Sequence, residues 1–284
     1  MRRFEYFRPH TLDEAFALQG KFPDSRFIAG GTDLVVQIKN RELQPSALIS
    51  LRSIPGLSGV AGDGVARIGA LTTITDLMNH PALQRTFPVL MDAARNLACV
   101  QIRNVATIGG NLCRCSPCAD TAPPLLVLDA KVRFRNAGED REIPIHDFFM
   151  GPGETCLAPN EILTEILLEA PAENARMLFL KKGRVKMDLA IASVAVLLEM
   201  DGERCRKARI AAGSVAPVPM RLPGVEALLE STVVTRELLA EIRHLAAESV
   251  SPIDDIRSTG AYRSEIVGVF VKRAIEQLMG WSPV

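Results

Sequence analysis

The chain has 284 residues, 48% of them hydrophobic and 23% charged, and it carries 33 basic and 33 acidic side chains. This composition excludes an intrinsically disordered chain, and the length favours two domains. The charge balance provides no electrostatic reason to bind nucleic acid or an anionic membrane. The longest apolar run, residues 189–198, is interrupted by Ser193 and is too short to predict a membrane span.

The N-terminal residues and the cysteines indicate in which cellular compartment the protein is expected. Arg2 and Arg3 are not followed by an apolar segment, so the sequence does not predict a secretory signal. Six cysteines without such a signal favour reduced thiols or metal ligands over disulfides. We therefore expect a cytoplasmic globular protein.

Short helices and strands are predicted in the first part of the chain. Thr11 and Glu14 form a capping box, which predicts a short helix that ends at Gly20. Apolar residues on one face predict another helix over residues 88–98. Strands are expected at residues 26–29, 47–51, 65–70, 102–108, 131–135, 142–145 and 162–168.

The pattern changes near residue 174. Two long apolar strands are expected at residues 189–200 and 208–215, joined through a turn at Asp201 and Gly202. Amphipathic helices are expected at residues 224–230, 235–250 and 262–279. The sequence thus predicts an α+β protein with one domain over residues 1–174 and a second, of antiparallel sheet and helices, over residues 175–284.

Two loops contain adjacent glycines. AGGTDL occupies residues 29–34 and TIGGN occupies residues 107–111, and each glycine pair follows a predicted strand. Adjacent glycines allow positive φ and close approach to backbone amides, which can form a nest for an anion such as a pyrophosphate. A tight turn without a ligand is the alternative. The glycine motifs of Rossmann and Walker sites do not occur, so a Rossmann dinucleotide site is not supported.

Several short motifs follow one another in a characteristic order. QIRNVATIGGN at residues 101–111 precedes Ser116-Pro117, Asp120 and Pro123. The other motifs are AGGTDL at 29–34, IGA at 68–70, NEIL at 160–163, MDLA at 187–190, GSVAP at 213–217 and PIDDIR at 252–257. Together they resemble the FAD-binding subunits of the xanthine dehydrogenase and carbon monoxide dehydrogenase family. The resemblance extends over essentially the whole chain, and the length is similar to that of a separate medium subunit.

This resemblance implies an FAD-binding fold of the vanillyl-alcohol-oxidase type, also called PCMH-like, in two subdomains, followed by a smaller C-terminal domain. It implies that the first glycine loop binds the FAD diphosphate, with Arg26 assisting, and that the second loop lines the other side of the cofactor. The cofactor-binding residues that it implies are Arg26, Ala29, Gly30, Gly31, Thr32, Asp33, Leu34, Ile68, Thr107, Gly110, Asn111, Asp120, Leu163 and Lys181.

Four of these positions have more specific implied roles. Asp120 corresponds to a ribose-binding aspartate in the family, while Ile68 and Leu163 correspond to positions that contact the flavin or the adenine. Lys181 resembles a lysine close to the isoalloxazine. For Lys181 a solvated surface lysine is the alternative.

The family also implies partners and a role in electron transfer. A large molybdopterin-binding subunit oxidises the substrate, and two [2Fe-2S] clusters in a small subunit deliver the electrons to FAD. NAD⁺ or another acceptor then takes them, in an assembly expected to be a dimer of heterotrimers. No catalytic acid or base is expected in this chain. A free-standing FAD oxidoreductase is one alternative function.

A cluster of cysteines departs from the pattern of the family. Cys113, Cys115 and Cys118 lie within six residues, and Cys99 lies on the preceding predicted helix. Such thiols can bind an iron–sulfur cluster or zinc, which makes a metal-binding scaffold another alternative. Small buried thiols, or redox-active thiols beside the flavin, are the other interpretations. Because the resemblance commits Asn111 and Asp120 to FAD, we expect no metal here.

Overall fold

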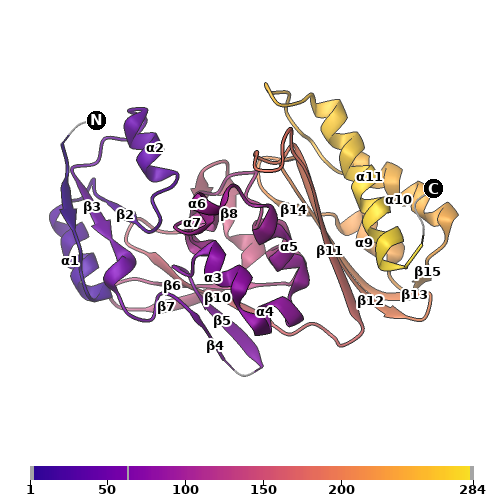
Figure 1. The fold of residues 1–284 in the computed structure, drawn as a ribbon, viewed down its shortest axis with the longest axis horizontal. Coiled ribbons are helices and arrows are strands. Elements are labelled where there is room, and N and C mark those ends of the chain that lie inside the picture. The colour runs from indigo at the N-terminus through magenta and orange to yellow at the C-terminus, as the bar shows by residue number, and fades with distance from the viewer. Residues whose placement is uncertain (1–2, 63, 282–284) are drawn as a thin grey trace.

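The computed structural model describes residues 3–62 and 64–281 as mixed helix and sheet, which confirms the predicted α+β class (Figure 1). The N-terminal sheet is parallel, with strand order β1-β3-β2. Its elements are β1 (Glu5–Phe7), α1 (Leu12–Lys21), β2 (Arg26–Ile28), α2 (Leu34–Lys39), β3 (Ala47–Ser50) and the 3-10 turn η1 (Leu51–Ser53). Thr11 caps α1 as predicted, since its hydroxyl accepts a hydrogen bond from the Glu14 amide at 3.1 Å.

An antiparallel sheet of order β4-β5-β10-β6-β7 forms the middle of the molecule. Its strands are β4 (Val60–Ala61), β5 (Val65–Gly69), β6 (Lys131–Arg135), β7 (Asp140–Pro144) and β10 (Ile162–Glu169). The helices between β5 and β6 are α3 (Ile74–Asn79), α4 (Pro81–Thr86), α5 (Pro88–Asn96), α6 (Val100–Arg103), α7 (Ile108–Cys113) and α8 (Ala122–Val127). A small hairpin follows β7, made of the 3-10 turn η2 (Ile145–Asp147), β8 (Phe149–Gly151) and β9 (Glu154–Thr155).

The C-terminal part is a second antiparallel sheet with helices on its outer face (Figure 1). Its strands are β11 (Ala175–Lys182), β12 (Ala192–Asp201), β13 (Arg204–Gly213), β14 (Met220–Arg221) and β15 (Thr232–Val233). Its helices are α9 (Pro223–Leu229), α10 (Arg236–Glu248) and α11 (Gly260–Leu278), at the positions that the sequence predicts.

Strand β12 is buried on both faces, which explains its nearly continuous apolar sequence. Alternate side chains of a strand point to opposite faces of the sheet. Ala195 and Leu197 belong to the central core, together with residues of α5 and α8, whereas Val194 and Val196 pack with α10 and α11. The C-terminal sheet therefore lies between helices α5 and α8 and its own helices, and one face of it is part of the central core.

One predicted strand is wrong, and the error lies in the second glycine loop. Residues 102–108 are expected to be extended, but they contain the end of α6, a short connection and the first residue of α7. Gly109 and Gly110 consequently lie in the first turn of a helix that Thr107 caps. The alternating pattern misleads because Ala106 and Ile108 are buried through tertiary contacts rather than through a sheet face.

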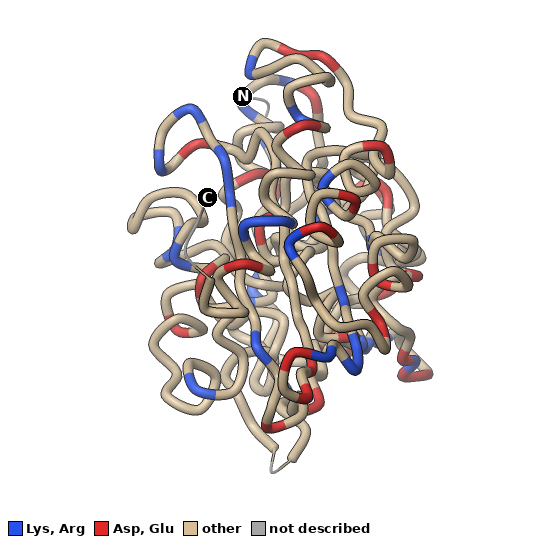
Figure 2. The backbone as a smooth tube through the Cα atoms, turned by 90° about the vertical axis from the view of Figure 1, so that its right-hand side faces the viewer, with Lys and Arg blue, Asp and Glu red and all other residues tan. Residues whose placement is uncertain are grey.

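Charged residues of both signs are distributed along the chain (Figure 2). Lys and Arg segments lie among Asp and Glu segments in this view, in keeping with the equal numbers of basic and acidic residues. Within residues 3–62 and 64–281, no helix is both long enough and apolar enough to cross a membrane.

Candidate functional site

The first glycine loop connects β2 to α2 and presents a row of unbonded amides. Gly31 has a φ of 74°, a conformation that favours glycine. Within the described part of the chain, the backbone amides of residues 30–34 donate no hydrogen bond to any protein atom. Free amides next to a helix N-terminus form a suitable site for an anion. The geometry here fits the diphosphate that the family resemblance implies for this loop.

The second glycine loop is built differently, and its amides are already used. The Gly109 amide donates to the Ala70 carbonyl at 2.8 Å, and the Gly110 amide donates to the Thr107 hydroxyl at 3.0 Å. A Cβ on Gly109 would overlap Ala70, whereas a Cβ on Gly110 would meet only the Thr107 hydroxyl. Gly110 is exposed. The expectation of two similar anion nests is therefore wrong: Gly109 is required for packing, and of the two glycines only Gly110 is exposed.

The two loops touch each other although they are far apart in the sequence. A Cβ on Gly30 would overlap the carbonyl of Val105, just before the second loop. On the exposed side, Arg114 Nε lies 3.7 Å from Asp33 Oδ1. Glycine at position 30 thus lets the chain segments approach closely. The structure brings the predicted loops together at one site.

Asp120 lies buried behind the second loop and has a half-satisfied carboxylate. Its Oδ2 accepts a hydrogen bond from Lys181 Nζ at 2.7 Å, while its Oδ1 is buried and has no hydrogen-bond partner among the described residues. Burial raises the pKa of Asp120 to about 6, although the Lys181 ammonium lowers it. A buried acceptor without a partner is costly. The free oxygen is suited to a hydroxyl donor of a bound ligand, such as a ribose.

The side chain of Asn111 is oriented by a residue that the sequence analysis does not single out. Thr121 is fully buried, and its hydroxyl donates to Asn111 Oδ1 at 2.6 Å. The Nδ2 of Asn111 makes no hydrogen bond within residues 3–62 and 64–281, so it remains available as a donor to a ligand. Thr121 directly follows Asp120 in the chain, but no spacing rule connects it to Asn111. Only the fold could identify this role.

The remaining predicted positions lie in different environments. Arg26 is exposed on β2, and its Nη1 donates to the Ser25 carbonyl at 3.0 Å. Ile68 and Leu163 are buried on the neighbouring strands β5 and β10, inside the central core. Their side chains are therefore enclosed by protein, and their contact with the cofactor stays a prediction. Lys181 has a side chain only 5% exposed, so the alternative of a solvated lysine is wrong.

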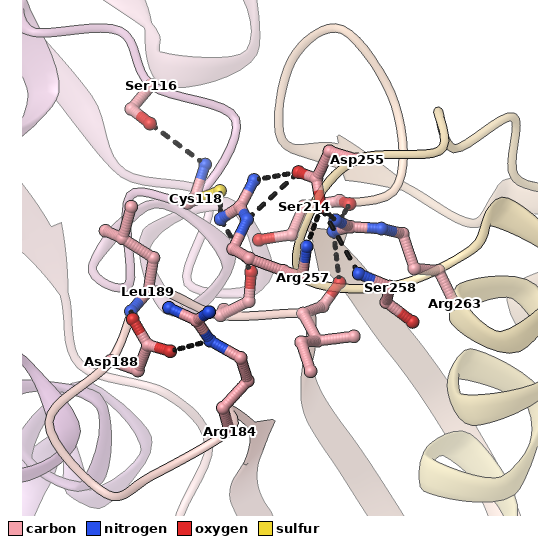
Figure 3. A network of polar contacts seen from close by, with 12 residues as sticks. Ser116, Cys118, Arg184, Asp188, Leu189, Ser214, Asp255, Arg257, Ser258 and Arg263 are labelled. Carbon is pink, nitrogen blue, oxygen red and sulfur yellow. Dashed lines mark hydrogen bonds and ion pairs between the residues drawn. The ribbon is translucent and has the colours of Figure 1, made fainter.

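Two cysteines of the cluster, Cys115 and Cys118, form hydrogen bonds with protein groups. Cys115 is buried, and its Sγ lies 3.2 Å from the Gly151 carbonyl and 3.0 Å from the Glu154 carbonyl. Cys118 Sγ accepts a hydrogen bond from Arg257 Nη1 at 3.1 Å (Figure 3). Among the described residues, no group of three or more His, Cys, Asp or Glu side chains is placed to hold a metal ion. Cys115 and Cys118 therefore take part in hydrogen bonds within the protein, whereas Cys113 is exposed.

A segment near the C-terminus joins the connection between α7 and α8 to the C-terminal domain (Figure 3). Asp255 accepts hydrogen bonds from Arg257 and from Arg263, both at 2.6 Å. Arg257 Nη1 also donates to Cys118, and Arg263 Nη1 donates to the Ile191 carbonyl at 2.7 Å. The hydrogen bond from the Arg257 side chain lowers the pKa of Asp255 below its usual range, and the positive charge of Arg263 lowers it further. This network thus connects the loop that follows α7 to α11 and to the residue just before β12.

Comparison with known proteins agrees with this geometry. The family model described as the FAD binding domain in molybdopterin dehydrogenase matches residues 2–170, and the CO dehydrogenase flavoprotein C-terminal domain matches residues 178–278. The carbon monoxide dehydrogenase medium chain of Hydrogenophaga pseudoflava is 33% identical over 275 residues, which cover 96% of each chain. The xanthine dehydrogenase FAD-binding subunit of Escherichia coli O157:H7 is 31% identical over 276 residues, which cover 96% of this chain and 94% of that subunit.

A solved structure supports the same relationship. The carbon monoxide dehydrogenase of Hydrogenophaga pseudoflava, in a form that lacks the Mo-pyranopterin moiety of the molybdenum cofactor, matches with a TM-score of 0.95. The match has 32% sequence identity and covers 98% of both chains. The predicted fold type and the predicted cofactor, FAD, are thereby confirmed. The chain belongs to the FAD-binding medium subunits of the molybdenum hydroxylase family, to which xanthine and carbon monoxide dehydrogenases belong.

Proposed function

We propose that this subunit carries electrons from the [2Fe-2S] clusters of a small partner subunit to NAD⁺ or another acceptor. The full-length similarity to medium chains of multi-subunit dehydrogenases carries this proposal. FAD supplies the redox chemistry when it is bound, and the protein supplies binding, orientation and shielding. The other proposed partner is a large molybdopterin-binding subunit, in a dimer of heterotrimers. The substrate is then selected outside this chain.

The proposed cofactor contacts follow the chemistry of the site. The free amides of residues 30–34 bind the diphosphate, with Arg26 adding positive charge at the edge of β2. Gly110 and Asn111 line the opposite side, and Asp120 Oδ1 accepts a hydrogen bond from a ribose hydroxyl. We also propose that the domain boundary lies at residue 174, just before β11.

The function is tested by purifying the tagged full-length chain gently from its natural host. We expect a yellow complex that contains a molybdopterin-binding chain and a [2Fe-2S] chain in equal amounts with this one. The purified complex is then assayed with NAD⁺, quinones and artificial dyes to identify the acceptor. Substrate oxidation by the isolated chain would contradict the proposal and favour a free-standing oxidoreductase. A chain that contains iron or zinc but neither retains nor rebinds FAD would favour the metal-binding scaffold.

Replacing Asp120 with alanine is expected to weaken FAD binding. The loss of one charge-assisted hydrogen bond costs about 1.5–3 kcal/mol, or roughly a 10- to 100-fold increase in Kd. The Kd is measured by flavin fluorescence during titration of the apoprotein. Asp13→Ala, at an exposed position in α1, is the control and should bind FAD normally. An unchanged Kd in Asp120→Ala would remove this residue from the site.

The affinity for FAD is also expected to fall as the pH decreases through about 6, the pKa of Asp120. The ionised carboxylate is the better acceptor for a hydroxyl donor, so FAD binds preferentially to the form that predominates above this pH. Titrations between pH 5 and 8 should reveal the step in the wild type, and Asp120→Asn should lack it. A step of the same size in Asp120→Asn would assign the titration to another group.

A further inference from the structure

Lys181 connects the C-terminal sheet to the interior of the cofactor site. It lies near the end of β11, whereas its partner Asp120 lies between α7 and α8 of the FAD domain. The Lys181 Nζ–Asp120 Oδ2 distance is 2.7 Å, and the two side chains are only 5% and 6% exposed. Lys181 Nζ also donates to the Asn96 carbonyl at 2.9 Å, at the end of α5. The ammonium thus makes both of these bonds to the FAD domain.

The two oxygens of Asp120 are in different situations because of this arrangement. Lys181 binds Oδ2, and the buried Oδ1 has no partner in the described part of the chain. A carboxylate that turned freely could present either oxygen to a ligand, at an entropic cost on binding. An ammonium bound to one oxygen restricts this rotation. It also keeps a buried carboxylate compatible with the ionised state.

We propose that Lys181 is a positioning residue, which acts on FAD through Asp120 and makes cofactor binding depend on the docking of β11 against α5. The inference rests on the proposed contact between Asp120 and the cofactor. It differs from the contact with the isoalloxazine that the family resemblance implies, because it assigns the ammonium to protein acceptors. The sequence neighbour Lys182 points away and is exposed, so it takes no part.

A double-mutant cycle on the full-length chain tests this arrangement. The variants are Lys181→Met, Asp120→Asn and the combination, and FAD binding to each apoprotein is measured by flavin fluorescence. Lys181→Met alone should raise the Kd roughly tenfold, as expected for the loss of one hydrogen bond to a charged group. In the Asp120→Asn background the same substitution should change the Kd less than about twofold, because the group through which Lys181 acts is already altered.

The controls separate positioning from a general loss of structure. Lys182→Met, on the opposite face of the same strand, should leave the Kd unchanged. Lys181→Arg keeps a donor for Asp120 and should recover most of the affinity that Lys181→Met loses. If Lys181→Met lowers thermal stability but Lys181→Arg restores stability without restoring affinity, the role is only structural and the inference is wrong.

The outcomes also distinguish this inference from the proposed function. If Asp120→Asn leaves the FAD affinity unchanged, the proposed contact at Asp120 fails, and the inference fails with it. Asp120→Asn could weaken binding while Lys181→Met has the same effect on the Kd in the Asp120→Asn background as in the wild type. In that case the proposed contact at Asp120 is supported. Lys181 then contacts the cofactor independently, and only the positioning role is overturned. An unchanged Kd in Lys181→Met likewise overturns that role alone.

Discussion

Replacing Gly30 with alanine is expected to yield a protein that retains no FAD and unfolds at a lower temperature. The new Cβ would overlap the Val105 carbonyl, so the segments that carry the two glycine loops would have to separate. Overpacking of this kind costs about 1–3 kcal/mol, and here the overlapping atoms belong to the backbone, which cannot rotate away. The measurements are the flavin-to-protein ratio after gel filtration and the thermal unfolding of the apoprotein.

Two other glycines provide controls for this prediction. Gly20→Ala adds the same methyl group within α1, where no atom lies within 4 Å, so FAD content and stability should be kept. Gly110→Val, at an exposed position where a Cβ would meet only the Thr107 hydroxyl, should prevent FAD retention with a smaller effect on the unfolding temperature. A Gly30→Ala protein with a full complement of flavin would show that the close approach of the loops is not needed for binding.

Replacing Arg263 with methionine is expected to cause the second large effect, a loss of stability. The residue is 1% exposed, and its side chain donates to Asp255 and to the carbonyls of Ile191 and Ser214. Removal of one member of a buried ionic network costs about 3–5 kcal/mol, because the groups left behind lose their partners. Urea denaturation of the apoprotein measures the change in the free energy of unfolding.

The matched control is Arg273→Met on the exposed face of the same helix, α11, which should change the free energy of unfolding by less than about 0.5 kcal/mol. The Arg263 substitution should also weaken FAD binding, since Asp255 and Arg257 connect this region to Cys118, between α7 and α8 (Figure 3). Equal stabilities for the two variants would show that the network contributes little to the fold.

Some features of the fold could be predicted because their signals are local. Examples are the capping hydroxyl of Thr11, the hairpin turn after β12 and the amphipathic pattern of α10. Each of these features depends only on residues that are close to one another in the sequence. The helical second loop could not be predicted in this way. Apolar and polar residues alternate there as they do in a strand. The conformation is instead set by long-range hydrogen bonds, from the Ile74 amide to the Ala106 carbonyl and from the Ile108 amide to the Thr72 carbonyl. Tertiary partners here override the local pattern.

By itself, the sequence determined the α+β class, the order of most elements and, through its ordered motifs, the family and the FAD cofactor. Only the tertiary structure decided how the glycines differ. Gly30 and Gly109 permit close packing, the amides of residues 30–34 have no partner among the described residues, and Gly110 is exposed. It also paired Lys181 with Asp120 and Thr121 with Asn111. The physical reason is that the interacting residues lie far apart in the sequence. A motif shows which donors and acceptors are present. Which of them pair with each other and which remain unpaired depends on segments that meet only after folding.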